Sequence, residues 1–174
     1  ASQGYRTINP ATGELLKSFD NATDQQIADA LDASQAAYEQ WSQKSVAERA
    51  AVVKRISELL AERSKDIAAV ITTEMGKSLG AAVGEVRYGA QIFGYYADEA
   101  EELLADQPIK QFSGQEAFVQ RLPIGPLLGI MPWNFPYYQV ARLAAPNVML
   151  GNTVLLKHAG NVPQAALVQE ELFR

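Results

Sequence analysis

The chain contains 174 residues, of which 48% are apolar, and its formal net charge at pH 7 is −5. This length allows one compact domain, or one and part of another, and an acidic balance without a Lys/Arg cluster argues against nucleic acid or an anionic membrane surface as partner. Because the sequence has no cysteine and one histidine, it excludes disulfides, thiolate metal ligands and a thiol nucleophile, and it does not favour a metal centre.

The first part of the chain predicts a hairpin followed by three helices. The expected elements are strands at 5–8 and 15–19, and helices beginning near Thr23, Ser45 and Ser64. Residues 9–14 contain the Pro and Gly that are typical of a turn between strands. Thr23 and Ser45 each begin a capping box, and the third helix is expected to end at Gly76.

A fourth helix is predicted from Leu79 to Leu104. Its apolar residues recur at spacings of four and three, which predicts a seam that packs on another helix or also serves a subunit interface. Four glycines interrupt it at a cost of about 1 kcal/mol each relative to Ala, so we expect them to permit close helix approach. They are Gly80, Gly84, Gly89 and Gly94.

The density of charged side chains changes near residues 106–108. Residues 1–110 carry 17 acidic and 11 basic side chains, whereas residues 111–174 carry three and four. A segment with so few charges is expected to be covered on both sides. With strands expected at 109–112 and 117–122, the predicted division is a hairpin and helical region over 1–107, an extended hairpin over 108–123, and the start of a sheet over 124–174.

The last part alternates between strands and helices. Strands are expected at 127–131 and 153–157, with helices at 137–150 and from Pro163 onward. This order with short loops predicts a doubly wound parallel α/β sheet, although the G-x-G-x-x-G fingerprint is absent from the first strand–helix turn. Because one strand–helix–strand unit cannot cover its own sheet, and no residue signals a helix end before Arg174, we expect the front part of a longer protein.

Asn134 is a candidate catalytic residue. It lies between Trp133 and Phe135, and the three residues are bracketed by two prolines in the turn after a predicted strand. Its amide can donate to an oxyanion, and one such donor contributes about 10²–10³ in rate. The alternative is a turn asparagine that caps the helix beginning at Tyr137.

Two cations are candidate ligand-binding residues. Lys157 ends a predicted parallel strand, where anionic ligands collect, although a lysine that extends out of the sheet into solvent is the alternative. Arg142 is the only charged residue between Arg121 and Lys157, and it needs a partner or a path to solvent. With Gln139 on the same helix face it can bind a carboxylate, and the alternative is an internal salt bridge.

The segments Gly125–Pro136 and Gly151–Lys157 resemble the aldehyde dehydrogenase superfamily, and the resemblance covers the whole chain. Arg142, eight residues after Asn134, and the segment Leu155–Pro163 are similar to the succinate-semialdehyde dehydrogenase branch. The resemblance implies a truncated Rossmann-like NAD(P)-binding fold. Asn9–Glu14 and Glu74–Lys77 also recur in the family, and we interpret them as a turn and a helix end without a chemical role.

The resemblance assigns roles to particular residues. It implies that Asn134 stabilises the thiohemiacetal oxyanion and that Arg142 holds the distal carboxylate of succinate semialdehyde. The implied cofactor residues are Met131, Pro132, Trp133 and Asn134 on the nicotinamide side, and Lys157, His158, Ala159 and Gly160 on the adenosine side. The implied substrate residues are Phe135, Tyr138, Gln139 and Arg142.

His158 is interpreted as a partly buried ring at a strand end rather than as a general base. Because Gly160 stands where NAD-preferring members often carry Glu, we expect NADP to be accepted as well as NAD.

The resulting prediction is the N-terminal part of an NAD(P)-dependent aldehyde dehydrogenase that oxidises succinate semialdehyde to succinate. The catalytic Cys and Glu of the family lie outside the chain, so the chain alone is expected to be inactive. The alternatives are a non-catalytic binding or oligomerisation module, or an aldehyde dehydrogenase for uncharged aldehydes.

We expect a homo-oligomer in the full-length protein. We also expect a cytoplasmic location, because no apolar run approaches ~20 residues and the start lacks a signal-peptide core.

Overall fold

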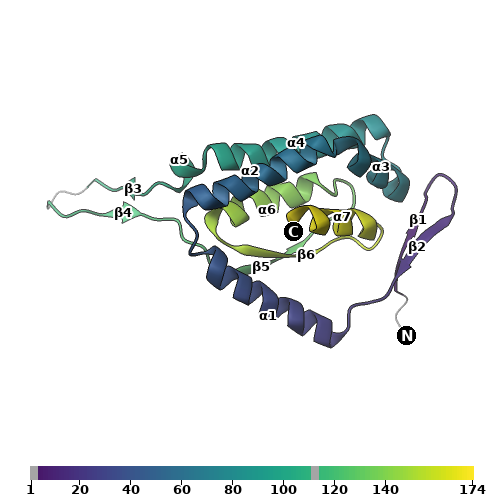
Figure 1. Ribbon diagram of the computed structural model, residues 1–174, viewed down its shortest axis with the longest axis horizontal. Helices are drawn as coiled ribbons and strands as arrows, with labels where there is room; N and C mark the ends of the chain where they lie inside the picture. Colours follow the sequence, from purple (N-terminus) through teal and green to yellow (C-terminus); the bar gives the residue numbers. More distant parts are fainter. Residues whose placement is uncertain (1–3, 111–113) are drawn as a thin grey trace.

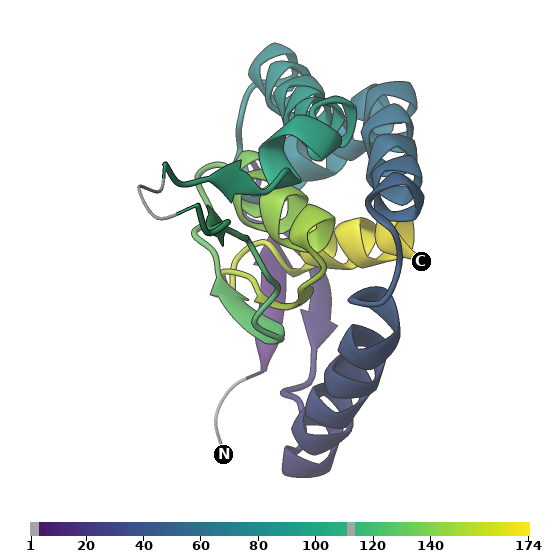
Figure 2. The ribbon, with the colours of Figure 1, turned by 90° about the vertical axis from the view of Figure 1, so that its left-hand side faces the viewer.

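The computed structural model describes residues 4–110 and 114–174 (Figure 1). In chain order the elements are β1 Tyr5–Ile8, β2 Leu15–Phe19, α1 Asp24–Trp41, α2 Val46–Glu62, α3 Ser64–Met75, α4 Leu79–Asp98, α5 Ala100–Leu104, β3 Gln107–Pro108, β4 Phe118–Val119, β5 Pro126–Ile130, α6 Tyr138–Leu150, β6 Thr153–Lys157 and α7 Pro163–Phe173. Helices α2, α3 and α4 form one layer, and α6 and α7 lie between this layer and the β5–β6 sheet. Helix α1 packs on the other side of the sheet, as Figure 2 also shows. The α/β class predicted from the sequence is confirmed.

Two hairpins lie at opposite ends of the molecule. In the first, Tyr5 pairs with Phe19, and the turn closes through the Asn9 N–H, which donates to the Glu14 carbonyl at 2.9 Å. In the second, which projects from the body in Figure 1, the paired strands β3 and β4 have two residues each. The strand predicted at 109–112 is wrong for residues 109 and 110, because β3 ends at Pro108, and residues 111 and 112 lie outside the described part of the chain. The strand predicted at 117–122 is too long, because β4 comprises only Phe118 and Val119. One further backbone bond follows Pro108, in which the Ile109 N–H donates to the Ala117 carbonyl at 2.8 Å.

The helix boundaries follow the predicted capping residues. The Thr23 hydroxyl accepts from the Gln26 N–H at 3.2 Å, and Ser45 and Glu48 form the second capping box. Helix α3 ends at Gly76, whose φ of 80° is accessible to glycine at low cost. The prediction of one helix from Leu79 to Leu104 is wrong, because the chain turns at Glu99 and continues as α5. The apolar spacing runs through this turn and Ala100 stays buried, so the pattern does not reveal the break.

The seam of α4 packs against α2 and α6. Its side chains Val86, Ala90 and Phe93 are buried in the core. A Cβ on Gly94 would lie 3.1 Å from the Ser57 hydroxyl, so this glycine allows the close approach of α2. A Cβ on Gly89 would lie 3.7 Å from the Ala141 Cβ, which is ordinary contact, and in the described residues a Cβ on Gly80 or Gly84 would meet nothing within 4 Å. The expectation of close approach is thus met at Gly94 only.

Strands β5 and β6 are parallel, with Ile130 opposite Lys157, and α6 connects them. A Cβ on Gly129 would lie 2.3 Å from Leu143 Cδ2, so any larger residue would force the end of the Leu143 side chain to move where α6 crosses the strand. Leu128 and Ile130, which alternate with Gly129, are 66% and 70% exposed. Within the described residues one face of β5 is therefore uncovered, in line with the expectation that a single strand–helix–strand unit cannot cover its own sheet. In the described part of the chain, no helix is both long and apolar enough to cross a membrane.

Candidate functional site

The predicted cofactor residues come from two segments that meet at the carboxyl ends of β5 and β6, and the predicted substrate residues Tyr138, Gln139 and Arg142 lie on α6. The Met131 N–H donates to the Lys157 carbonyl at 3.1 Å, which extends the parallel pairing by one bond. His158 Nε2 lies 2.9 Å from the Pro136 carbonyl. These bonds join the loop 131–136 to the loop 157–160. This edge of a parallel sheet is where ligands of α/β proteins bind.

His158 is a buried connector between the two loops. Its Nδ1 accepts from the Ala159 N–H at 2.9 Å, so the ring proton resides on Nε2 and is donated to the Pro136 carbonyl. The Gln169 amide donates to the same carbonyl at 3.1 Å. Burial lowers the pKa of His158, with a smaller opposing effect from its bond to Pro136. A neutral ring with both nitrogens in use fits the interpretation of a structural histidine at a strand end.

Helix α6 is held at both ends by charged side chains from other helices. At its start, the buried Glu85 carboxylate accepts from the Tyr137 N–H at 2.9 Å and from the Tyr138 N–H at 3.3 Å. At its end, Arg49 Nε donates to the Met149 carbonyl at 2.9 Å. A carboxylate at the N-terminus and a cation at the C-terminus both match the helix dipole. The helix that follows Asn134 is therefore fixed in position.

Asn134 does not cap α6, because Glu85 occupies the N-terminal N–H groups. The alternative interpretation of Asn134 as a helix cap is thus wrong. The residue is exposed, and its side-chain amide has no hydrogen-bond partner within residues 4–110 and 114–174. Its carbonyl, by contrast, accepts from Lys77 Nζ at 2.8 Å. The backbone is held while the amide is left accessible.

Lys77 is a site residue that the sequence did not reveal. Its ammonium pairs with Glu85, donates to the Asn134 carbonyl, and lies 3.8 Å from the centre of the Phe135 ring. The Lys77 side chain is 12% exposed and the Glu85 side chain 1%. A buried carboxylate needs such a partner. Glu74–Lys77 has the pattern of a helix end, and no spacing in the sequence connects Lys77 with Asn134.

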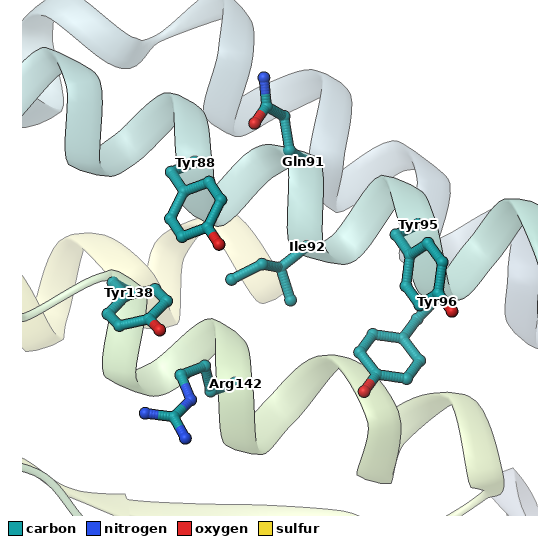
Figure 3. A pocket seen from close by; sticks show the side chains of 7 residues that line it. All are labelled: Tyr88, Gln91, Ile92, Tyr95, Tyr96, Tyr138 and Arg142. Atoms are coloured by element: carbon teal, nitrogen blue, oxygen red, sulfur yellow. The ribbon is translucent and has the colours of Figure 1, made fainter.

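A pocket of about 590 Å³ lies between α4 and α6 (Figure 3). Its lining consists of Tyr88, Gln91, Ile92, Tyr95, Tyr96, Tyr138 and Arg142. The rings of Tyr88 and Tyr138 are stacked with centroids 5.3 Å apart, and Phe135 meets Tyr138 edge-on at 5.9 Å. The residues contributed by α4 were missed at the sequence level, because a tyrosine at helical spacing reads as core. These residues of α4 line the same pocket as Tyr138 and Arg142 only because α4 packs on α6.

Arg142 reaches solvent at this pocket. Its guanidinium carbon lies 5.4 Å from the centre of the Tyr138 ring. Within the described residues it forms no ion pair, so the alternative of an internal salt bridge is not found there. Gln139, one turn before Arg142 on the same helix, is not among the residues that line this pocket. The guanidinium is available to an anionic group.

The remaining predicted residues lie on the β6 side. Lys157 is exposed at the end of β6, and its ammonium lies 5.7 Å from the centre of the Tyr5 ring. Gly160 follows in the loop that leads to α7, and it also lies against Tyr5. Met131 is half-buried, whereas Pro132 and Trp133 are exposed beside Asn134. The structure thus places the predicted cofactor residues along one edge of the sheet.

Parallel strand–helix–strand units with loops of this kind at the carboxyl ends of the strands are typical of nucleotide-binding α/β folds. The chain belongs to the aldehyde dehydrogenase family, since the sequence profile described as "Aldehyde dehydrogenase family" matches residues 1–174. This confirms the resemblance inferred from the sequence.

Three relatives illustrate the similarity. The chain is 46% identical over 169 residues to the succinate-semialdehyde dehydrogenase (NADP(+)) of Deinococcus radiodurans, covering 97% of this chain and 35% of that protein. It is 45% identical over 163 residues to succinate-semialdehyde dehydrogenase (NADP(+)) 1 of Mycobacterium tuberculosis, covering 92% and 36%. The crystal structure of succinic semialdehyde dehydrogenase from Streptococcus pyogenes, in complex with NADP+ as the cofactor, superposes with a TM-score of 0.93 at 40% identity, covering 97% and 37%. The chain therefore spans about a third of the length of these relatives.

Proposed function

We propose that this chain forms the N-terminal part of a succinate-semialdehyde dehydrogenase that uses NADP or NAD. The observation that carries the proposal is the exposed guanidinium of Arg142 at the aromatic pocket, on the helix that directly follows the Asn134 loop. The names of the relatives support the same substrate. We use the term completed enzyme for a protein that contains this chain and also the part of the full-length relatives that the chain does not cover.

The substrate chemistry fits the pocket. Succinate semialdehyde carries an aldehyde at one end of a short chain and a carboxylate at the other. A guanidinium can donate two parallel hydrogen bonds to that carboxylate, and the flat rings of Tyr138 and Phe135 can pack against the methylene groups. In this proposal Arg142 fixes the distal end of the substrate, and Phe135, Tyr138 and Gln139 are the other substrate residues.

Asn134 supplies the oxyanion donor in the proposed mechanism. When the family's Cys thiolate, which lies outside this chain, attacks the aldehyde, the carbonyl oxygen becomes negatively charged. The free amide of Asn134 would donate to that oxygen, and the bond from Lys77 Nζ to the Asn134 carbonyl keeps the backbone in place. The family's Glu, also outside the chain, would activate the water that releases succinate.

The residues at the edge of the sheet fit a nucleotide cofactor. Lys157 exposes an ammonium without an ion pair among the described residues, and Gly160 brings no carboxylate to the same loop. Such a site accepts a 2′-phosphate without repulsion. The proposed cofactor residues remain Met131, Pro132 and Trp133 on the nicotinamide side, and Lys157, His158, Ala159 and Gly160 on the adenosine side. Bound there, NADP or NAD would accept the hydride.

The other features expected of the completed enzyme stay predictions. They are the division at residues 1–107, 108–123 and 124–174, assembly into a homo-oligomer, and a cytoplasmic location. The projection of the β3–β4 hairpin from the body is the observation that supports assembly through this segment (Figure 1).

The proposal is tested by Arg142→Leu in the completed enzyme. Loss of a carboxylate partner costs about 2–5 kcal/mol, so kcat/KM for succinate semialdehyde should fall by about 30-fold or more. Butanal, which has the same chain length without the carboxylate, should change by less than about threefold. Gln91→Leu is the matched control, since it removes an uncharged polar group from the same pocket. Equal losses on both aldehydes would make Arg142 a structural residue and remove the basis for this substrate.

A further inference from the structure

The first strand of the chain contacts the cofactor loop through one aromatic side chain. The ring of Tyr5 covers Gly160 so closely that a Cβ on this glycine would lie 3.0 and 3.1 Å from Tyr5 Cδ1 and Cε1. The same ring lies beneath the ammonium of Lys157, with the nitrogen 5.7 Å from the ring centre. One tyrosine therefore contacts two of the residues that lie on the adenosine side of the proposed site.

Strand β1 is fastened where it can hold this ring in place. Thr7, two residues after Tyr5, points to the same face of the strand. Its hydroxyl donates to Glu74 Oε1 at 2.8 Å, and the buried Glu74 carboxylate accepts from the Gln164 N–H at 2.7 Å and the Ala165 N–H at 2.8 Å. These two N–H groups belong to the first turn of α7, directly after the cofactor loop. The strand and the loop are thus tied together through Glu74.

We propose that Tyr5 is a specificity-determining residue of the cofactor site. It keeps position 160 free of a side chain and steadies the ammonium of Lys157, so that the site admits a 2′-phosphate. This inference rests on the proposed function, because it assumes that the loop 157–160 binds the adenosine end of a nicotinamide cofactor. Acceptance of NADP is then a property of the Tyr5–Gly160 pair and not of Gly160 alone.

The physical reason lies in the space over Gly160. A carboxylate in this loop would bind the 2′-hydroxyl of NAD and repel the 2′-phosphate of NADP. With the Tyr5 ring in place, the Cβ of a Glu at position 160 would be tightly packed, and the ring would have to give way by a few tenths of an ångström. Displacement of the ring also changes its contact with the ammonium of Lys157, which lies 5.7 Å from the ring centre. Substitutions at the two positions should therefore be strongly non-additive.

The test is a double-mutant cycle in the completed enzyme, with the Kd of NADP and of NAD measured separately by calorimetric titration. Tyr5→Ala should weaken NADP about two- to fivefold and leave NAD unchanged, as expected for loss of an exposed cation–π contact. Gly160→Glu alone should weaken both nucleotides. Gly160→Glu combined with Tyr5→Ala should bind NAD more tightly than NADP.

Matched variants separate this role from folding. Tyr5→Phe keeps the ring and should bind both nucleotides normally. Leu15→Ala removes an exposed apolar side chain from the same hairpin and should leave both values of Kd unchanged. Lys157→Ala, which should weaken NADP more than NAD, sets the scale for the effect of Tyr5.

Two results would overturn the inference. If the single variant Gly160→Glu prefers NAD over NADP as strongly as the double variant with Tyr5→Ala does, the two positions act independently. Tyr5 then has no role in cofactor specificity. If Tyr5→Phe weakens NADP as much as Tyr5→Ala does, the aromatic face is not responsible. A completed enzyme that binds neither nucleotide would refute the proposed function itself, whereas normal binding with additive variants would refute only the role of Tyr5.

Discussion

Acidification should destabilise this chain through a single histidine. His158 is the only histidine in the sequence, and in the fold it is neutral, with Nδ1 accepting from the Ala159 N–H and Nε2–H donating to the Pro136 carbonyl. Protonation of Nδ1 would break the first of these bonds inside a buried site. Burial accordingly lowers the pKa of His158 below its ordinary value of 6.5.

The sign and size of the effect follow from proton linkage. Below pH 6.5 the unfolded chain takes up a proton at His158 while the folded chain does not, so the free energy of unfolding falls as the pH drops. The loss begins near the unfolded pKa and continues down to the folded pKa. From pH 7.5 to pH 5.5 it has a ceiling of about 1.4 kcal/mol, which corresponds to one proton taken up only by the unfolded state.

Urea unfolding followed by tryptophan fluorescence at several pH values measures this slope, and His158→Gln provides the reference. Burial raises the pKa of Glu74, so that group changes stability in the opposite direction, with stability lost as the pH rises above 4.5. Because Glu74 is present in both proteins, subtracting the two curves removes its contribution. A variant curve parallel to that of the parent between pH 7.5 and 5.5 would refute the assignment of a neutral buried His158.

Two further predictions concern the network that holds the site. Lys77→Met leaves the buried Glu85 carboxylate without its cation and should lower the free energy of unfolding by about 3–5 kcal/mol, measured in urea, while adding Glu85→Gln should restore part of it. A loss below about 1 kcal/mol would mean that the pair does not hold the Asn134 loop. Thr7→Val removes the hydroxyl that donates to Glu74 and should cost about 1–3 kcal/mol in the same assay. No measurable loss would show that β1 is not fastened to α7 through this bond.

Local features of the chain were predictable because they depend on neighbours in sequence. The capping boxes at Thr23 and Ser45, the helix end at Gly76, and the parallel strand–helix–strand order after residue 125 all depend on side chains within a few positions of one another. Family membership was likewise legible in the segment around Asn134. The turn at Glu99 escaped prediction, because apolar spacing continues through it.

What only the tertiary structure decided is how distant residues combine at the site. Lys77 and Asn134 are 57 positions apart, and their bond exists because α4, which presents Glu85 to the start of α6, brings both to one place. Tyr5 reaches Gly160 for the same kind of reason, since Glu74 joins β1 to α7. A sequence pattern records which faces are apolar, whereas buried charges take partners wherever packing places them. The proposed site residues were therefore visible in the sequence, and the residues that hold them in position were not.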